Sequence, residues 1–328
     1  MGEVTNQIAI VLGVLAACFA GPAAALFVLI RRKATARQNR RSPIGIALLR
    51  GPGHSLREQL DEAHNDLTWD LVLLMVVPLL ALALFLAQSH LRGLPQMAHL
   101  APVYAVAAIA FIAYMLRKLL KAGTRLDHLK AGYDAEVAVG QELDQLMRQG
   151  AATFHDLPAE QFNIDHVVVA AEGVFAIETK GFTKPNQGRG KADATVVYDG
   201  DTLKFPTWTT KEPLAQAERQ AAWLAKWLSS AVGSPVSVLP VIALPGWFVE
   251  RTGRGRVRVF SGKELAGLLK SRGAQALTAQ DVQRIAHQVE QRCRTVTPLY
   301  AQAPKAWRST AADRFVSRRR SPSPHARR

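Results

Sequence analysis

Three uncharged apolar runs within the first 120 residues constrain this chain more than any other feature. They cover residues 8–30, 71–88 and 100–116. The first holds about 23 residues, and a helix needs about 20 to cross the core of a bilayer. The third is rather short, but basic side chains that follow it can extend to the interface. We therefore expect residues 1–120 to form a three-span membrane region with the lipid bilayer as partner. Packing in a globular core is the alternative for the last two runs.

The basic residues indicate the orientation of these spans. No basic side chain precedes the first run, whereas Arg31, Arg32 and Lys33 follow it at once, which argues against a cleaved secretory signal. Positive charge favours the cytoplasmic side, so the loop 31–69 should be cytoplasmic, with a short amphipathic helix near Ser55–Asp66. We expect a multi-pass protein of the bacterial inner membrane, with its N-terminus outside and everything after residue 116 in the cytoplasm.

Several chemistries are excluded by what the sequence lacks. The two cysteines, Cys18 and Cys293, form no Cys/His cluster, so a zinc finger is excluded. No phosphate-binding loop of the GxxxxGK[ST] type is present, and no strand-linked GxGxxG. A transport component is disfavoured because no ionisable residue lies inside the apolar runs.

The most informative polar stretch runs from Phe162 to Lys180 and has the pattern of a β-hairpin. Two arms rich in β-branched and aromatic residues flank a break that contains Gly173. A turn centred between Ala171 and Glu172 pairs Val169 with Val174. The same register places Asp165 opposite Glu178, on the face that Lys180 shares.

Two buried carboxylates beside one ammonium group need a further proton or cation, since they repel each other and lose hydration. Oxygen ligands favour Mg²⁺ or Mn²⁺ over zinc. A divalent cation would offset charge on a scissile phosphate, with a water placed near Lys180 as the attacking group. The alternative is an exposed hairpin face with a weak Glu178–Lys180 ion pair.

The remaining pattern predicts a mixed α/β sandwich rather than a doubly wound sheet. Glu136 begins an otherwise apolar helical stripe, and Trp223 and Trp227 are expected to anchor a core rather than to stack on bases. We expect a domain over residues 121–294 and a disordered basic tail over 295–328 that contacts anionic lipid or nucleic acid. The expected strands are 153–157, 194–198, 202–205, 236–244 and 256–260, and the expected later helices are 213–228, 263–271 and 278–293.

The run from Lys130 to about Gln220 resembles the nuclease-related domain (NERD), a branch of the PD-(D/E)xK nuclease superfamily. Five pieces match in order and spacing: Gly132-Tyr-Asp-Ala-Glu136, His155-Asp-Leu-Pro158, Asn163-Ile-Asp-His-Val167, Gly173-Val-Phe-Ala-Ile-Glu-Thr-Lys-Gly181 and Glu212-Pro-Leu-Ala-Gln216. The resemblance covers about a third of the chain and implies a restriction-endonuclease-like core, a mixed sheet flanked by helices. One departure is Ala135, where the family usually has Gly, and a helix should tolerate it.

The resemblance also implies roles for individual residues. Asp165, Glu178 and the Thr179 carbonyl would bind Mg²⁺ or Mn²⁺, with Glu136 as an additional carboxylate. Lys180 would orient or activate water, and Gln216 is the helical glutamine that the family places near the site. The expected function is metal-dependent hydrolysis of DNA on the cytoplasmic face. The alternative is an inactive, membrane-tethered nucleic-acid-binding or scaffold protein.

A basic loop follows the hairpin and is a candidate for nucleic-acid contact. Lys184, Arg189 and Lys191 lie in it, close in sequence to the expected site. Lysine and arginine side chains bind backbone phosphates without reading sequence. A solvated flexible loop is the alternative at this position.

Overall fold

The computed structural model describes residues 20–21, 24–25, 27–32, 44–92, 100–271 and 275–298. The chain divides into two compact units, one of Met1–Phe19 with Leu49–Arg294 and one of Ala20–Leu48 with Thr295–Arg328. The site and the helices discussed below lie in the first unit. Most of the first apolar run and most of the basic tail lie outside the described residues.

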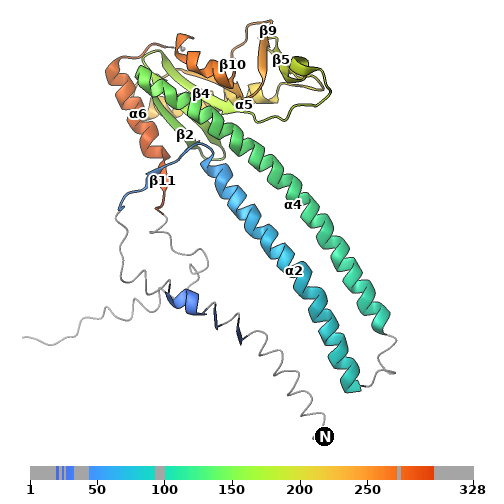
Figure 1. Ribbon diagram of the computed structural model, residues 1–328. Coiled ribbons are helices and arrows are strands. Elements are labelled where there is room, and N and C mark those ends of the chain that lie inside the picture. The colour runs from blue at the N-terminus through green and yellow to red at the C-terminus, as the bar shows by residue number, and fades with distance from the viewer. Residues whose placement is uncertain are drawn as a thin grey trace, which may run out of the picture. The chain divides into compact units, whose positions relative to one another are not determined.

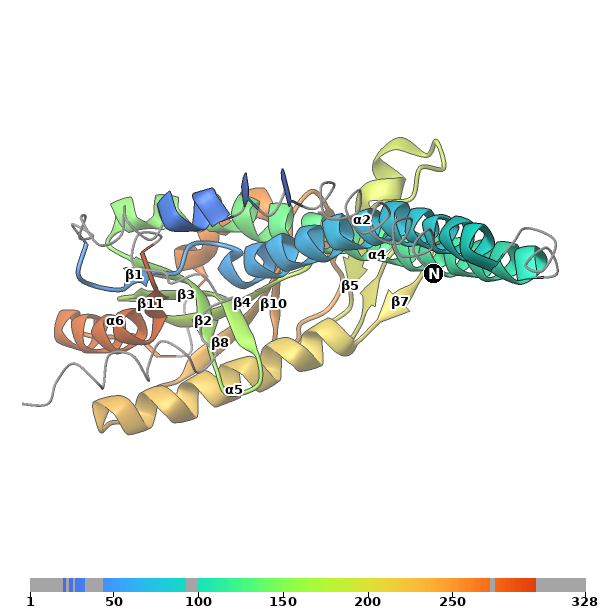
Figure 2. The same ribbon diagram turned by 90° about the horizontal axis from the view of Figure 1, so that it is seen from below.

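Two long helices, α2 (His54–Arg92) and α4 (Ala101–Asp144), lie side by side in both views (Figures 1 and 2). Their apolar runs face outward: Leu79 in α2 is 64% exposed and Ile109 in α4 is 67% exposed. At the end of this apolar section Lys118 Nζ contacts Asp70 Oδ1 at 2.6 Å. Both helices are long and apolar enough to cross a membrane, a criterion that core helices and signal sequences also meet.

The helices are longer than the sequence pattern predicted. The short helix expected near Ser55–Asp66 and the second apolar run form one helix, α2. The third run likewise continues without a break into the helix that carries Glu136. The predicted boundary between residues 120 and 121 therefore falls inside α4. No Pro or strong turn signal separates the polar and apolar parts, so each helix continues across the change in composition.

A five-stranded mixed sheet forms the centre of the α/β part, in the order β10-β8-β4-β3-β2. β10, β8 and β4 are parallel, while β4, β3 and β2 are antiparallel neighbours. The hairpin register is confirmed, because Val169 pairs with Val174 and Ala170 with Gly173. The strands are β2 (Ala152–Pro158), β3 (Asn163–Ala170), β4 (Gly173–Thr179), β8 (Val238–Leu244) and β10 (Arg258–Ser261).

Helices cover both faces of this sheet, as the mixed α/β prediction required. On one face Val168 and Ile177 pack with Val139 and Leu143 of α4 and with Leu265. The other face packs against α5 (Glu212–Val232) and α6 (Ala279–Cys293), and there Trp223 and Trp227 lie partly buried against the core. Because strand side chains alternate, Val167 and Val169 of β3 face α5 and α6, whereas Val168 and Ala170 face α4.

A smaller sheet in the order β7-β6-β5-β9 adjoins the basic loop. The hairpin expected around Asp199-Gly200 joins β5 and β6. The helix expected over 263–271 is a 3₁₀ helix, η4. Bounds of the remaining elements are β5 (Thr195–Tyr198), β6 (Leu203–Lys204), β7 (Thr209–Thr210), β9 (Phe248–Arg251), β1 (Leu48–Leu49), β11 (Arg294–Val296), η2 (Gln145–Gln149), η3 (Gly190–Ala194) and η4 (Gly262–Lys270).

Candidate active site

The two strands of the hairpin bring Asp165 and Glu178 together. The β3–β4 ladder ends with His166 opposite Ile177, and Asp165 and Glu178 are the residues that follow this last pair on the two strands. The Glu178 side chain lies on the α5 face of the sheet, where Gln216 and Gln220 contact it. The backbone N–H of Thr179 donates to Asp165 Oδ2 at 2.7 Å, which fixes the Asp165 carboxylate beside the end of β4.

Glu178 is buried and held by three donors. Gln216 Nε2 and Lys180 Nζ each lie 2.7 Å from Glu178 Oε1, and Gln220 Nε2 donates to Oε2 at 2.6 Å. Lys180 Nζ also donates to Gln216 Oε1 at 2.9 Å. A carboxylate has about four lone-pair sites, so these contacts leave about one acceptor site on Glu178.

The helix α5 positions both glutamines on the stripe that it turns toward the sheet. Gln216 and Gln220 are one turn apart, and Gln220 lies beside the buried residues Ala217 and Ala221. Gln220 Nε2 donates also to the carbonyl oxygen of Asn163, at 3.3 Å. Because both neighbours are acceptors, the amide nitrogen must face them. Gln220 Oε1 is then buried without a donor among the described residues.

The Asp165 carboxyl has a pKa well above its ordinary value. Burial is the largest cause, followed by the negative charges of Glu178 and Glu136, while the Thr179 N–H and Lys180 act in the opposite direction. Three carboxylates therefore influence one another at this end of the hairpin. Lys180 supplies one positive charge, which does not neutralise the set.

Glu136 comes from α4, on the opposite side of the sheet, twenty residues beyond the apolar run that ends at residue 116. Burial, and then the charges of Asp156 and Glu178, raise the pKa of Glu136 to about 8. Gly181 permits the close approach of β4 to α4: a Cβ at this position would lie 2.6 Å from the Ala131 carbonyl oxygen and 2.8 Å from Ala135 Cβ. Ala135, the departure from the family pattern, is buried in this contact.

A pair of buried histidines lies on the α4 face behind the carboxylates. His155 Nδ1 and His166 Nδ1 are 2.8 Å apart, His155 Nε2 lies 3.0 Å from Asp144 Oδ1, and His166 Nε2 lies 3.2 Å from Thr179 Oγ1. Burial lowers the pKa of both rings. The rings tie β2 and β3 to the end of β4.

Two of the three basic-loop side chains have partners within the molecule. Arg189 Nε donates to Asp193 Oδ1 at 2.9 Å, and Lys191 Nζ lies 4.9 Å above the centre of the Phe248 ring. Lys184 is exposed, and its ammonium lies close to Gly246. Their contact with nucleic acid stays a prediction.

The structure adds residues that the sequence did not single out. Gln220 donates to Glu178 as Gln216 does, although the family motif indicated only Gln216. Asp156 and Asn163 lie within the matching motif pieces, but nothing in their spacing indicated a role. For Gln220 the available signal was its position four residues after Gln216 on one helix face.

Oxygen donors with raised pKa values have the chemistry that a hard divalent cation requires. The unpartnered Gln220 Oε1 and the remaining acceptor site on Glu178 agree with that chemistry. Across the described ranges, however, no three His, Cys, Asp or Glu side chains are grouped so that they could hold a metal ion. The residues fit a metal by donor type, and the Thr179 carbonyl would have to be one of the ligands.

Comparison with protein families identifies the region that builds this site. Residues 131–245 match the family model of the nuclease-related domain (NERD), so the chain contains a nuclease-related domain. Glu136, Asp165, Glu178, Lys180 and Gln216 all lie within the matched range. Comparisons with curated proteins and with solved structures gave no match.

Proposed function

We propose that this protein is a membrane-anchored, metal-dependent nuclease that hydrolyses phosphodiester bonds in DNA on the cytoplasmic face. The observation that carries the proposal is the convergence of Asp165, Glu178 and Lys180 at one end of the hairpin, with Gln216 donating to Glu178. It lies inside a nuclease-related domain.

Asp165, Glu178, the Thr179 carbonyl and Glu136 would hold Mg²⁺ or Mn²⁺. Such a cation supplies positive charge where negative charge develops on the phosphate. Lys180 is held by Glu178 and Gln216, so its ammonium group is fixed in position to orient a water molecule toward phosphorus. Gln216 and Gln220 hold the Glu178 carboxylate in position, because each donates a side-chain N–H to one of its oxygens.

The membrane anchor is supported by the outward-facing apolar residues of α2 and α4. Side chains such as Leu79, Leu84, Val106 and Ile109 are more than half exposed, and a continuous apolar surface of this kind requires a nonaqueous neighbour. We place the runs 71–88 and 100–116 in the bilayer, together with 8–30, and the basic segments on the cytoplasmic side. Retention of the chain in vesicles after alkaline extraction tests this part separately.

The second candidate is a membrane-tethered nucleic-acid-binding or scaffold protein that does not cut. It is favoured by one observation: three donors already surround Glu178, so cation binding there requires the remaining acceptor site or an exchange of partners.

The experiment is cleavage of plasmid DNA, single-stranded DNA and RNA by the full chain in detergent, with Mg²⁺, Mn²⁺ or a chelator. The nuclease proposal predicts metal-dependent cleavage that is lost in Asp165→Asn and Glu178→Gln and retained in Glu212→Gln, an exposed residue of α5. Salt-sensitive binding without cleavage, unchanged in these variants, would favour the second candidate instead.

A further inference from the structure

The segment Arg50–Leu56, which leads into α2, lies against the helix face that carries Glu136. It ends 75 residues before the matched domain begins. We call it the docking segment. A Cβ on Gly140 would lie 2.5 Å from Pro52 Cγ, and a Cβ on Gly53 would lie 2.7 Å from the Tyr133 ring. Tyr133, Glu136 and Gly140 share one face of α4 because they are three and four residues apart. The Gly53 backbone N–H accordingly contacts the Glu136 carboxylate and opposes the rise of its pKa.

Asp156 attaches the docking segment to the sheet. Its Oδ2 accepts from Arg50 Nη1 at 2.8 Å, from the Ser55 backbone N–H at 3.0 Å and from Ser55 Oγ at 2.7 Å. The carboxylate is buried and satisfies an N–H in the first turn of α2, one of the groups that a helix start leaves without an intrahelical partner.

The backbone at Asp156 departs from regular strand geometry to make these contacts. Its φ is +49°, the one positive φ of a non-glycine residue among the described residues. The β2–β3 ladder pairs His155 with His166 and Leu157 with Ile164, but the intervening pair, Asp156 with Asp165, is absent from it. A regular pair would put these two carboxylates opposite each other. Left-handed geometry costs on the order of 1–3 kcal/mol and collects at functional sites.

Hydrogen bonds continue from the docking segment to Glu178. Asn163 Nδ2 donates to Ser55 Oγ at 2.6 Å. The Asn163 carbonyl accepts from Gln220 Nε2 at 3.3 Å, and the same nitrogen donates to Glu178 Oε2 at 2.6 Å. Ser55 at the start of α2 is therefore connected to the central carboxylate through the side chain and backbone carbonyl of Asn163 and the side chain of Gln220.

We propose that the docking segment is part of the active site, with Ser55 and Asp156 as positioning residues that hold Glu136 and the Asn163–Gln220–Glu178 chain in place. This inference rests on the proposed nuclease function. It makes the site dependent on α2, so a chain reduced to residues 121–328 would lack part of its own catalytic centre.

The test compares the full chain in detergent with Ser55→Ala, Ser55→Thr and the control Ser261→Ala. Ser261 caps η4 and contacts none of the site residues named above. Ser55→Ala should lower kcat about tenfold at unchanged KM, the scale expected when a group supporting a ligand is lost. It should also speed amide hydrogen exchange around Asn163 and in the first turns of α5. Ser55→Thr should restore both properties, and Ser261→Ala should change neither.

If Ser55→Ala speeds amide hydrogen exchange only in the docking segment and the start of α2, and kcat is unchanged, the inference is overturned. If the wild-type chain cuts no nucleic acid, the proposed function fails and the exchange experiment decides this inference alone. Spread of faster exchange to α5 then supports the connection, and its confinement to residues 50–60 removes it.

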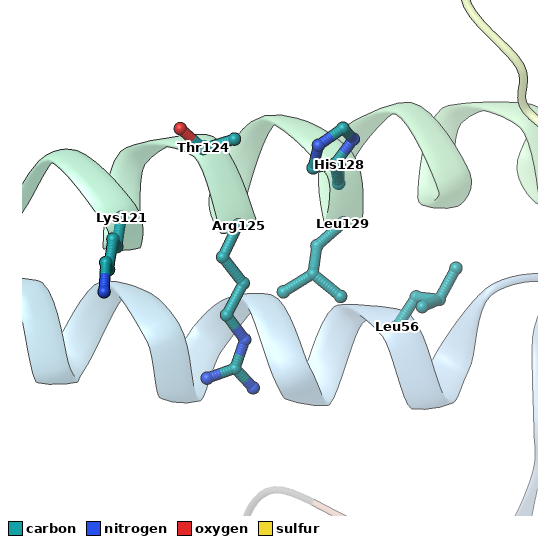
Figure 3. A pocket seen from close by; sticks show the side chains of 6 residues that line it. All are labelled: Leu56, Lys121, Thr124, Arg125, His128 and Leu129. Atoms are coloured by element: carbon teal, nitrogen blue, oxygen red, sulfur yellow. The ribbon is translucent and has the colours of Figure 1, made fainter.

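A second inference comes from an independent feature, a cavity of about 550 Å³ between α2 and α4. Figure 3 shows Lys121 and Arg125 extending from α4 toward α2. Both also line the neighbouring cavity, together with Trp69, Asp66 and Asp70. Asp70 is already paired with Lys118. Within the parts of the chain that the structure describes, neither Lys121 nor Arg125 forms an ion pair. The cavity lining is Leu56, Lys121, Thr124, Arg125, His128 and Leu129.

Lys121 lies at the depth of the headgroup layer of a bilayer, and the Arg125 backbone lies just beyond it, within reach of a long side chain. Lys118 and Asp70 lie at the end of the apolar section, and Lys121 and Arg125 are three and seven residues further along α4. At about 1.5 Å per residue, these positions are about 5 and 10 Å beyond Lys118. The polar layer on each side of a bilayer is about 5–8 Å thick. Trp69, 67% exposed, lies at the same level, where aromatic residues mark the interface.

We propose that this cavity binds the headgroup phosphate of an anionic phospholipid through Lys121 and Arg125. The site rests on the membrane part of the proposed function. Basic pockets between membrane helices on the cytoplasmic side are suited to such headgroups by charge and position.

Native mass spectrometry of the full chain, released from micelles with phosphatidylglycerol or phosphatidylcholine, tests this site. The wild type should retain phosphatidylglycerol at least about tenfold better than the double variant Lys121→Gln, Arg125→Gln, while Arg117→Gln, outside both cavities, should match the wild type. The proposal is overturned if the wild type retains phosphatidylcholine as well as phosphatidylglycerol. It is also overturned if the double variant keeps its lipid but loses oligonucleotide binding. A chain that stays dispersed without detergent would refute the membrane anchor itself.

Discussion

The acidic side chains on the two sides of the central sheet have opposite surroundings. On the α5 side, Gln216, Gln220 and Lys180 surround Glu178, and each contacts one of its carboxylate oxygens at 2.6 or 2.7 Å. On the α4 side, Glu136 lies near other carboxylates, and its pKa is raised to about 8. One side thus surrounds its carboxylate with donors, whereas the other has a place for a proton or a cation. A site for a divalent cation would require both features before the cation binds: one carboxylate held in place by donors, and one place that a proton occupies until the cation replaces it.

The largest test removes the carboxylate of Glu178. Glu178→Gln keeps the size of the side chain but turns an acceptor-only group into one that also donates, against Gln216 Nε2 and Lys180 Nζ. We expect DNA cleavage to fall by about 10²–10³-fold, the scale of losing a main electrostatic contribution to catalysis. The measurement is initial rate of plasmid nicking at saturating Mg²⁺. A rate within tenfold of the wild type would remove Glu178 from the mechanism.

The next test separates the two sides physically. In Gly181→Ala, the new Cβ would lie 2.6 Å from the Ala131 carbonyl oxygen, so β4 and α4 must move apart. We expect a loss of about 1–3 kcal/mol in the free energy of unfolding, as for other overpacked sites. Denaturant unfolding of the full chain measures it. Gly267→Ala, where a Cβ meets nothing within 4 Å, is the control and should be neutral or stabilising.

The smallest test uses pH. The pKa of Glu136 is raised in the folded chain from 4.5 to about 8. A raised pKa means that the folded state binds the proton more tightly, so this contribution to stability is complete below pH 4.5 and is lost as pH rises through about 8. Because neighbouring carboxylates share the proton, we expect a loss of about 1–2 kcal/mol over this range, at about 1.4 kcal/mol per pKa unit.

Thermal unfolding at several pH values measures this loss of stability. Glu136→Gln should flatten the dependence, and saturating Mg²⁺ should reduce it because the cation competes with the proton. An unchanged slope in Glu136→Gln would show that Glu136 is not the group that takes up the proton.

The hairpin and its register could be predicted from sequence because local rules determine them. A two-residue turn and the period-two alternation fix Val169 opposite Val174, and Asp165 opposite Glu178 follows by counting. The family motif added Glu136 and Gln216, which counting along the hairpin could not supply.

The rest depended on contacts between distant segments. Ser55 and Asp156 are 101 residues apart in sequence, and no local pattern indicates that a serine and an aspartate at this separation will meet. The sequence pattern predicted several short helices in place of α2 and α4 for another reason. The change from polar to apolar residues near Asp70 suggested a break, but no proline or turn residue ends the helix there.

The most direct measurement is titration of the full chain with Mn²⁺ by calorimetry at pH 7, in two buffers of different ionisation enthalpy. The account predicts binding at a site shared by Asp165, Glu178 and Glu136, with release of about one proton per cation, because a carboxyl with a pKa of about 8 must give up its proton. Binding should be lost in Asp165→Asn, and proton release should be lost in Glu136→Gln. Absence of Mn²⁺ binding, or binding that neither variant changes, would contradict it.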